Sequence, residues 1–302
     1  MNRLLTDIGR LKLINPVTVA SGTFGIESAE YMDLNLLGAV VTKTITKEPK
    51  DGNPPPRLFE VPGGLLNSIG LQNPGLTSFI QDVLPLYDQY KAPLIVSFSG
   101  SSIKEFQEIL SRLEEFQDIA GYEVNVSCPN VEKQGIAFGT DEDVLFELVE
   151  KLRALTYKQL TVKLSPNVTN IIQIAQAAVD GGADCLALIN SLYGMAIDWK
   201  TGKTRIAKGI CGYTGAAVKP VALATVYKVA SNIKIPILAM GGIYSWQDAL
   251  EFIYAGATAI AVGTGQFIHP DLPLRIIEEL DFYVHEQDMD LNSIRGKVQG
   301  IQ

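Results

Sequence analysis

The chain has 302 residues, a formal net charge of −8, three cysteines and two histidines. This length suits a single α/β barrel domain. The negative charge argues against nucleic acid as a partner. Three cysteines without a CxxC spacing are expected to form neither a disulfide framework nor a zinc site, and two histidines are too few for a three-histidine centre, so we expect no metal.

The first 15 residues contain no long apolar run, so we expect neither a signal peptide nor a membrane anchor. The sparse, unpaired cysteines suit a reducing compartment. Together these features predict a cytoplasmic protein.

Short apolar runs that favour β-strands alternate along the chain with segments of helical periodicity. The strand runs are Pro16–Ala20, Ala39–Thr44, Leu94–Phe98, Tyr122–Val126, Leu160–Leu164, Cys185–Asn190, Ile235–Met240 and Ala259–Val262. The clearest helical segments are Ile103–Phe116, Val144–Leu155, Ile171–Val179, Val221–Val229 and Trp246–Ala255. This alternation predicts one (β/α)₈ barrel over residues 1–302, with a doubly wound open sheet as the alternative. We expect Leu4–Leu13 to form a small hairpin that closes the barrel bottom.

Two connections, residues 45–75 and 191–219, are much longer than the few residues that usually join a strand to a helix. The first contains the proline-rich run Gly52–Arg57 and the amide-rich run Asn67–Gly75. Long loops at the carboxyl-terminal face of a barrel usually form lids or pocket walls, so we expect that role here. Variable surface decoration is the alternative.

The carboxyl ends of the predicted strands carry polar side chains and glycines. In chain order they are Ser21-Gly22, Lys43-Thr44, Ser97, Asn125 with Cys128, Lys163, Asn190-Ser191, Gly241-Gly242 and Gly263-Thr264-Gly265. A lysine that faces a barrel needs an anion or an acceptor, although a single lysine often reaches solvent instead. Glycines before a helix allow backbone N–H groups to approach a phosphate, and such sites recur after strands seven and eight of barrels.

Residues 123–130 place a thiol at the end of a strand. Val124 and Val126 alternate with Glu123 and Asn125, and the strand must stop at the turn that contains Cys128. A buried, inert thiol is the alternative for Cys128, and it is the interpretation we favour for Cys185, which lies inside an apolar strand.

These features together suit flavin mononucleotide (FMN). The glycines after the last two strands would hold its phosphate, and Lys163 would lie near the N1/O2 edge of the ring. Cys128 would then be placed as a general base beside a hydride acceptor.

The sequence resembles the dihydroorotate dehydrogenase family over essentially its whole length. The segments that carry the resemblance are Lys43-Thr44, Lys47-Glu48-Pro49, Gly52-Asn53-Pro54, Asn67–Asn73, Asn125–Asn130, Val162–Asn167, Asn190-Ser191, Met240–Ile243 and Val262–Thr264. The resemblance implies an FMN-containing (β/α)₈ barrel that oxidises dihydroorotate to orotate in pyrimidine biosynthesis, which agrees with the fold predicted above.

Cys128 resembles the soluble class of the family, because the membrane-bound class has serine there. The runs Gly135–Gly139 and Thr46–Pro49 resemble the NAD-dependent subclass. That subclass implies a partner subunit with FAD and a [2Fe–2S] cluster, in a heterotetramer built around a catalytic homodimer, with NAD⁺ as the final acceptor. A homodimer that reduces fumarate is the alternative.

The family pattern also implies roles for individual residues. Cys128 and Lys43 are implied to be catalytic, with Cys128 removing the C5 proton. The implied substrate-binding residues are Lys43, Asn67, Ser68, Ile69, Gly70, Leu71, Asn125, Asn190 and Ser191. The implied FMN-binding residues, one FMN per chain, are Ser21, Lys43, Thr44, Asn125, Lys163, Ile189, Gly215, Gly241, Gly242, Gly263 and Thr264.

The chain departs from the family pattern at two places. Ser97 stands where asparagine is usual, and this shorter side chain is expected to leave a flavin contact to water. The run Cys211–Gly215 replaces a more glycine-rich one, which weakens the cofactor role of Gly215 and leaves Cys211 without an assigned role.

Other function classes explain less of the sequence. A tRNA dihydrouridine synthase is also a flavin barrel with a catalytic cysteine, but an acidic chain does not suit a polyanionic substrate. A flavin-free phosphate-binding isomerase leaves Cys128 and the run Asn67–Gly75 without a role. A non-catalytic binding protein has no feature in its favour.

Overall fold

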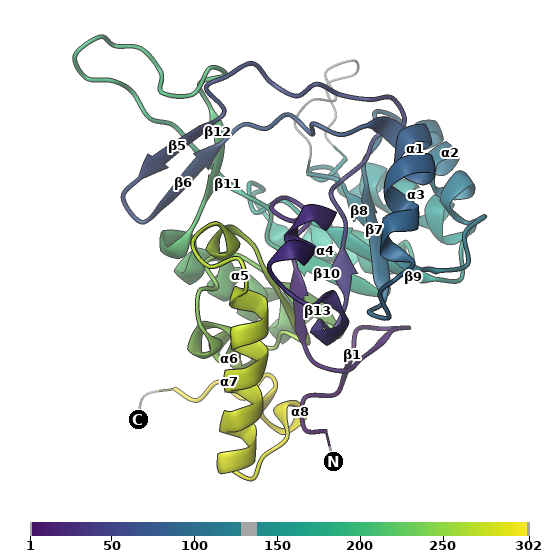
Figure 1. Cartoon of the computed structure of the whole chain (residues 1–302), viewed down its shortest axis with the longest axis vertical. Coiled ribbons are helices and arrows are strands. Elements are labelled where there is room, and N and C mark those ends of the chain that lie inside the picture. Colours follow the sequence, from purple (N-terminus) through teal and green to yellow (C-terminus); the bar gives the residue numbers. More distant parts are fainter. Residues whose placement is uncertain (1, 128–137, 301–302) are drawn as a thin grey trace.

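Among residues 2–127 and 138–300, which the computed structural model of the chain describes, eight parallel strands form one sheet (Figure 1). They are β3 (Val17–Val19), β4 (Val40–Val41), β7 (Leu94–Phe98), β8 (Ile119–Asn125), β9 (Gln159–Lys163), β10 (Cys185–Leu188), β13 (Ile237–Ala239) and β14 (Ala259–Val262). The outer strands β3 and β4 meet through a parallel bridge between Thr18 and Ala39. The predicted (β/α)₈ barrel is confirmed, and the open sheet is excluded.

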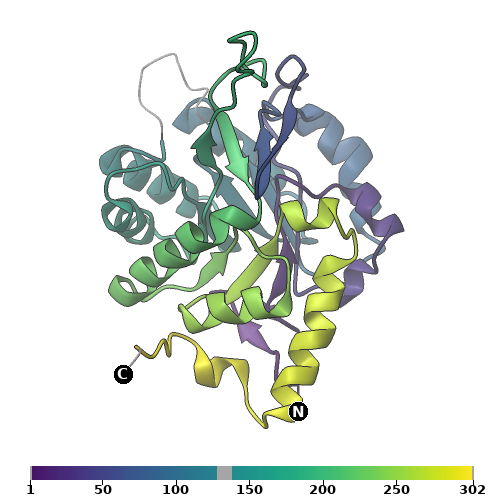
Figure 2. The same cartoon turned by 90° about the vertical axis from the view of Figure 1, so that its left-hand side faces the viewer.

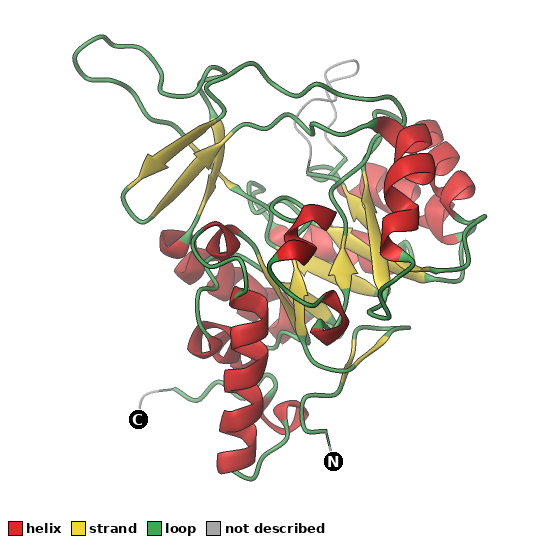
Figure 3. Ribbon diagram, viewed as in Figure 1, coloured by secondary structure: helices red, strands yellow, loops and turns green. Residues whose placement is uncertain are grey.

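Helices cover the outside of this barrel (Figure 3). The longer ones are α2 (Ile103–Leu113), α3 (Glu142–Arg153), α4 (Ile171–Asp180), α5 (Lys219–Asn232), α6 (Trp246–Tyr254) and α7 (Leu272–Glu286). Side chains cap several of them; the Ser102 hydroxyl, for example, accepts the Glu105 N–H at the start of α2. The five predicted helices are present, with shifts of one to three residues at most of their ends. No helix in the described ranges is long and apolar enough to span a membrane.

Several short helices and α7 were not predicted. The short ones are η1 (Ile26–Glu30), η2 (Leu34–Leu36), the consecutive α1 (Gly75–Ser78), η3 (Phe79–Val83) and η4 (Leu84–Tyr87), then η5 (Ala216–Val218), η6 (Thr264–Phe267) and α8 (Leu291–Ile294). Helices of three to five residues are too short to show a helical hydrophobic period, so sequence periodicity does not find the short ones.

Alternate residues of β10 belong to two different cores. Leu186 and Leu188 of β10 join the large cluster between strands and helices, whereas Cys185 and Ala187 join a smaller cluster inside the barrel. The core position predicted for Cys185 is confirmed, and burial raises the pKa of its thiol to about 12.

The predicted amino-terminal hairpin is present and closes one end of the barrel. Strand β1 (Thr6–Asp7) pairs antiparallel with β2 (Lys12–Leu13). Ile8 and Leu13 are fully buried in the inner cluster. Figures 1 and 2 place this hairpin at the same end of the molecule as the N-terminus.

The two long connections form an antiparallel sheet that was not predicted. Its order is β11 (Leu192–Gly194), β12 (Cys211–Thr214), β6 (Gly64–Asn67) and β5 (Leu58–Val61). Pairing of Asn67 with Gly212 joins the first connection to the second. In Figures 1 and 2 this sheet stands at the end of the barrel opposite the hairpin.

Candidate active site

Two lysines reach the same part of the barrel mouth. Lys163 ends β9, its side chain is only 6% exposed, and its Nζ donates to Ser21 Oγ at 3.2 Å. Lys43 follows β4, and its Nζ donates to the Gly22 carbonyl at 3.2 Å. Burial, and then repulsion from Lys163, lower the pKa of Lys43 below its ordinary value. Two cations held this close favour an anionic or electron-rich ligand.

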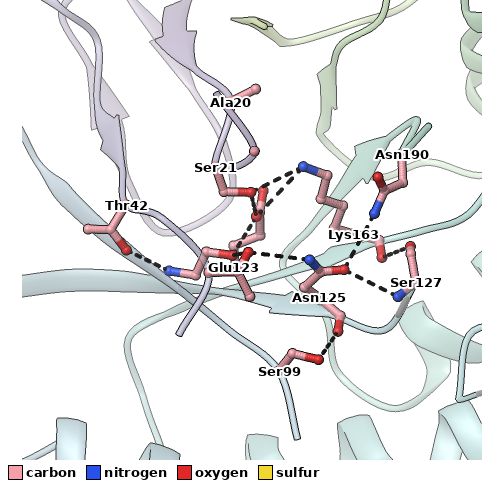
Figure 4. A network of polar contacts seen from close by, with 12 residues as sticks. Ala20, Ser21, Thr42, Ser99, Glu123, Asn125, Ser127, Lys163 and Asn190 are labelled. Carbon is pink, nitrogen blue, oxygen red and sulfur yellow. Dashed lines mark hydrogen bonds and ion pairs between the residues drawn. The ribbon is translucent and has the colours of Figure 1, made fainter. Parts of the chain in front are cut away.

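A buried carboxylate that sequence reasoning did not assign to the site lies beside Lys163 (Figure 4). Glu123, on the inner face of β8, is 1% exposed. Its Oε1 accepts hydrogen bonds from Ser21 Oγ at 2.7 Å and Ser97 Oγ at 2.8 Å, and lies 3.9 Å from Lys163 Nζ. Its alternation with Val124 was the available signal, because that pattern had already placed Glu123 on the same face as Asn125.

The Ser97 side chain takes part in this hydrogen-bond network. Its side chain is fully buried, donates to Glu123 and shares a 2.8 Å hydrogen bond with Thr44 Oγ1. The hydroxyl of Ser97 thus bonds to the neighbouring carboxylate and threonine, and the expectation that its short side chain leaves a flavin contact to water stays a prediction.

The amide of Asn125 connects several strand ends. Its Nδ2 donates to Thr44 Oγ1 at 3.3 Å, while its Oδ1 accepts the Ser127 N–H at 3.2 Å and Asn190 Nδ2 at 3.5 Å. Strands β4, β8 and β10 therefore deliver their polar ends to one place, as expected at the carboxyl end of a parallel barrel.

A polar cavity of about 240 Å³ opens between the barrel mouth and the small sheet. Every residue predicted to bind substrate lines it: Lys43, Asn67, Ser68, Ile69, Gly70, Leu71, Asn125, Asn190 and Ser191. Ser21, Thr44 and Lys163 line it as well. Residues from four separate parts of the chain are thus brought together, although their contacts with a ligand remain predictions.

Asn73, which was not assigned to the site, fixes the loop that forms one wall of this cavity. Its Oδ1 accepts the N–H groups of Thr46 (3.1 Å) and Gly75 (2.8 Å). Its Nδ2 donates to the carbonyl of Leu71 at 2.7 Å and to Thr46 Oγ1 at 2.9 Å. Leu71 has a left-handed φ of 53°, an uncommon conformation for leucine that this clamp helps to hold.

A second, smaller cavity of about 90 Å³ is lined mainly by glycine-containing turns. Seven of the residues predicted to bind FMN lie around it: Lys163, Ile189, Gly215, Gly241, Gly242, Gly263 and Thr264. Gly241 and Gly242 have φ values of 122° and 79°, which other residues rarely adopt. This cavity shares Gly22, Lys163, Asn190 and Ser191 with the polar cavity, so the two are contiguous.

Comparison with protein families identifies the family to which the chain belongs. The family model described as dihydroorotate dehydrogenase matches residues 3–283. The chain belongs to the dihydroorotate dehydrogenase family.

Individual relatives agree with this assignment. The chain is 48% identical over 296 residues, 97% of each protein, to the Geotalea uraniireducens (strain Rf4) protein named dihydroorotate dehydrogenase B (NAD(+)), catalytic subunit. Proteins with the same name from Thermoanaerobacter pseudethanolicus and Geobacillus kaustophilus are 46% and 47% identical, over 98% and 93% of this chain and 99% and 90% of their own.

In this member of the dihydroorotate dehydrogenase family, the unusual run before Gly215 belongs to the small sheet. Cys211 packs with Leu66 and Ile206, and burial raises the pKa of its thiol. Gly215 has a φ of 115°, and a Cβ there would lie 2.5 Å from the Gly64 Cα. Glycine at 215 is therefore required by packing, whatever its contact with a cofactor.

A larger apolar cavity of about 550 Å³ adjoins the polar one and was not predicted. Phe24, Phe79 and Phe267 line it, and it shares Lys43 and Asn67 with the polar cavity. The mouth therefore combines an apolar region with a polar one. Cys128 and residues 129–137 lie outside the described residues, so the structure leaves the predicted position of the catalytic thiol untested.

Proposed function

We propose that the chain oxidises (S)-dihydroorotate to orotate in the cytoplasm, as a step of pyrimidine biosynthesis, with bound FMN as the immediate hydride acceptor. The relatives that carry the name dihydroorotate dehydrogenase B support the reaction. Family membership over residues 3–283 supports the same chemistry.

The observation that carries the proposal is the composition of the polar cavity. Side-chain amides of Asn67, Asn125 and Asn190 line it together with the Lys43 ammonium. A dihydropyrimidine carboxylate has ring N–H groups, carbonyls and one negative charge, and each needs a partner once it leaves water. Amides supply both donors and acceptors, and the ammonium offsets the carboxylate.

Features of the glycine-lined cavity fit FMN. A Cβ added at Gly22 would meet no protein atom within 4 Å, and one at Gly263 would meet none closer than 3.7 Å. Packing within the protein therefore does not require glycine at either position, and both leave room for the close approach of a ligand. We propose that Gly241, Gly242, Gly263 and Thr264 hold the phosphate.

The remaining predicted cofactor residues line one or both of the two cavities. They are Ser21, Lys43, Thr44, Asn125, Lys163, Ile189 and Gly215. When bound, FMN supplies an electron-poor ring that accepts hydride at N5.

The chain itself handles the proton. We propose that Cys128, as thiolate, removes the proton from C5 of dihydroorotate while the hydride leaves C6, so that the C5=C6 double bond of orotate forms. Lys43 offsets the charge of the substrate carboxylate, and the amides of Asn67 and Asn190 orient the ring. The thiol returns its proton to water before the next turnover.

For the electron acceptor, we propose NAD⁺, reached through a partner subunit that carries FAD and a [2Fe–2S] cluster. The name "catalytic subunit" of the relatives supports a partner. The assembly we propose is a heterotetramer around a homodimer of this chain. A homodimer that passes electrons to fumarate is the alternative.

An anaerobic titration tests this function. Purified chain is mixed with dihydroorotate while the visible absorbance of the flavin is followed, and fumarate or NAD⁺ is then added separately. We expect bleaching that neither acceptor reverses with this chain alone, and that NAD⁺ reverses once the partner subunit is present. Absence of flavin, or flavin that stays oxidised, would contradict the proposed function, and reoxidation by fumarate would replace NAD⁺ with the alternative acceptor.

A further inference from the structure

We infer that Glu123 is a positioning residue whose negative charge holds the Lys163 ammonium in place at the border of the two cavities. This inference rests on the proposed function, because the role of Lys163 is to stabilise the reduced flavin. Nothing in the family resemblance or in the names of the relatives assigns a role to Glu123.

Hydrogen bonds from two sides converge on one oxygen of this carboxylate. On one side Lys163 Nζ donates to Ser21 Oγ, and Ser21 Oγ donates to Glu123 Oε1. Since a serine hydroxyl has one proton, the proton given to Glu123 leaves the Ser21 lone pairs to accept from lysine. This arm therefore connects the ammonium to the carboxylate with every donor pointing the same way.

The second arm begins at Asn125 (Figure 4). Asn125 Nδ2 donates to Thr44 Oγ1, which shares a hydrogen bond with Ser97 Oγ. Ser97 Oγ in turn donates to the same Glu123 Oε1 at 2.8 Å. A run of aligned hydrogen bonds in a buried place polarises its members, and here the polarisation favours negative charge on Glu123.

The other carboxylate oxygen of Glu123 has different surroundings. Glu123 Oε2 is buried and has no hydrogen-bond partner among the described residues. Retaining a buried charge is costly unless an opposite charge is close, and Lys163 Nζ, 3.9 Å away, is that charge.

Replacing Glu123 with glutamine separates charge from shape. Glutamine keeps the acceptor oxygen for Ser21 and Ser97 but removes the negative charge. Lys163 would then be a buried ammonium beside Lys43 without the Glu123 counter-charge, and we expect its Nζ to leave its present position and turn into the polar cavity. Reduced flavin carries extra negative charge near N1, so it would lose stabilisation.

The test is the two-electron midpoint potential of the flavin in the loaded full-length chain, measured anaerobically at fixed neutral pH. In Glu123→Gln we expect the equilibrium constant for flavin reduction to fall by at least about tenfold, which is a drop of about 30 mV. Glu123→Asp keeps the charge and should lie closer to the unaltered protein. Ser99→Ala is the matched control, because Ser99 is equally buried and donates to the Asn125 carbonyl without touching Glu123 or Lys163.

The other possible results of the potential measurement also decide about the inference. An unchanged potential in Glu123→Gln would make Glu123 a hydrogen-bond anchor only, and an equal fall in both Glu123 variants would make its shape decisive. A rise would show direct repulsion of the flavin by Glu123, because deleting a nearby negative charge has the opposite sign. All three contradict the inference, as does loss of flavin from both variants, whereas loss from Glu123→Gln alone supports it. Absence of flavin from the unaltered protein would instead contradict the proposed function.

Discussion

The Lys43 side chain is half-buried and has a second lysine nearby, and burial followed by repulsion from Lys163 lowers its pKa. We therefore expect Lys43→Met to stabilise the flavin-free protein by about 1 kcal/mol, because an apolar side chain of similar length removes a partly buried charge. The same variant should have lost most of its activity. Chemical unfolding of the flavin-free proteins measures the first effect, and steady-state assay measures the second.

The pH dependence of this gain has a definite sign. The pKa of Lys43 lies below 10.5 in the folded protein and near 10.5 in the unfolded chain. Between these values the unfolded chain binds more protons, so the unaltered protein gains stability as pH rises. The advantage of Lys43→Met should shrink toward pH 10.5. Lys47→Met, an exposed control, should change stability by less than about 0.5 kcal/mol, and an equal gain there would contradict this explanation.

Cys128 is the residue on which the proposed proton transfer depends. Cys128→Ala should keep the fold and the flavin but slow flavin reduction by dihydroorotate by roughly 10²–10⁴-fold, since a general base is lost. Cys128→Ser should retain some activity, with an optimum at higher pH because a hydroxyl is harder to deprotonate. Stopped-flow absorbance measures both, with Cys185→Ala as the control thiol; full activity of Cys128→Ala would remove Cys128 from the mechanism.

At the scale of single residues, sequence reasoning identified residues of a type that is unusual at their position in a strand. It missed residues whose role is to hold other residues in place. Lys43, Lys163 and the strand-end amides were found because charged or polar ends of apolar strands are informative. Glu123 lies in the middle of a strand, where a charged residue is easily assigned to solvent. The four groups that hydrogen-bond to the Asn73 side chain lie in a loop, and the path of a loop cannot be derived from local sequence pattern.

At the scale of elements, the first long connection depends on the Asn73 clamp. Asn73→Ala removes four hydrogen bonds from a buried position, which we expect to cost roughly 2–4 kcal/mol of local order. The loop through Leu71 would then have to be ordered by the substrate, so the KM for dihydroorotate should rise at least about tenfold.

Steady-state kinetics on the flavin-loaded protein checks this effect. Asn232→Ala is the control, because Asn232 is exposed on α5 and donates only to the Lys228 carbonyl of its own helix. A KM for Asn73→Ala equal to that of the control would contradict the clamp.

The small sheet shows which elements sequence pattern does not find. The long connections were correctly expected to form pocket walls, but the pairing of β6 with β12 joins residues about 145 positions apart, as in the contact between Asn67 and Gly212. Local alternation carries no information on such a partner. One signal was present: Pro62-Gly63 connects β5 and β6, and Gly63 has the positive φ of 73° that such a turn requires.

At the scale of the whole molecule, the two ends of the barrel have different tasks. The hairpin with Ile8 fills one end, and the cavities open at the other. Ile8→Ala should therefore cost about 2–5 kcal/mol of unfolding free energy while leaving the potential of the flavin and the KM unchanged.

Chemical unfolding and kinetics of the same preparation separate these effects. Ile14→Ala, at a side chain that is 49% exposed, serves as the control and should be nearly neutral. A raised KM in Ile8→Ala would show that the floor of the barrel is coupled to its mouth.

The barrel was predictable because its signals repeat. Eight apolar runs separated by helical segments admit few topologies, and runs that are apolar on both faces leave only a closed barrel or an open sheet covered on both sides. Strand ends were predicted less well: the run Ala39–Thr44 contains only the two-residue strand Val40–Val41, since its last residues turn into the mouth. The proposed function requires the chain to leave the sheet after Val41, because Lys43 lines the polar cavity.

A crystal structure of the chain with FMN and orotate would test the central claim most directly. We predict phosphate density at Gly242 and Thr264, the flavin beside Lys163, and orotate among Asn67, Asn125 and Asn190. Phosphate outside the glycine-lined cavity, or orotate bound away from the three amides, would contradict the assignment of the two cavities.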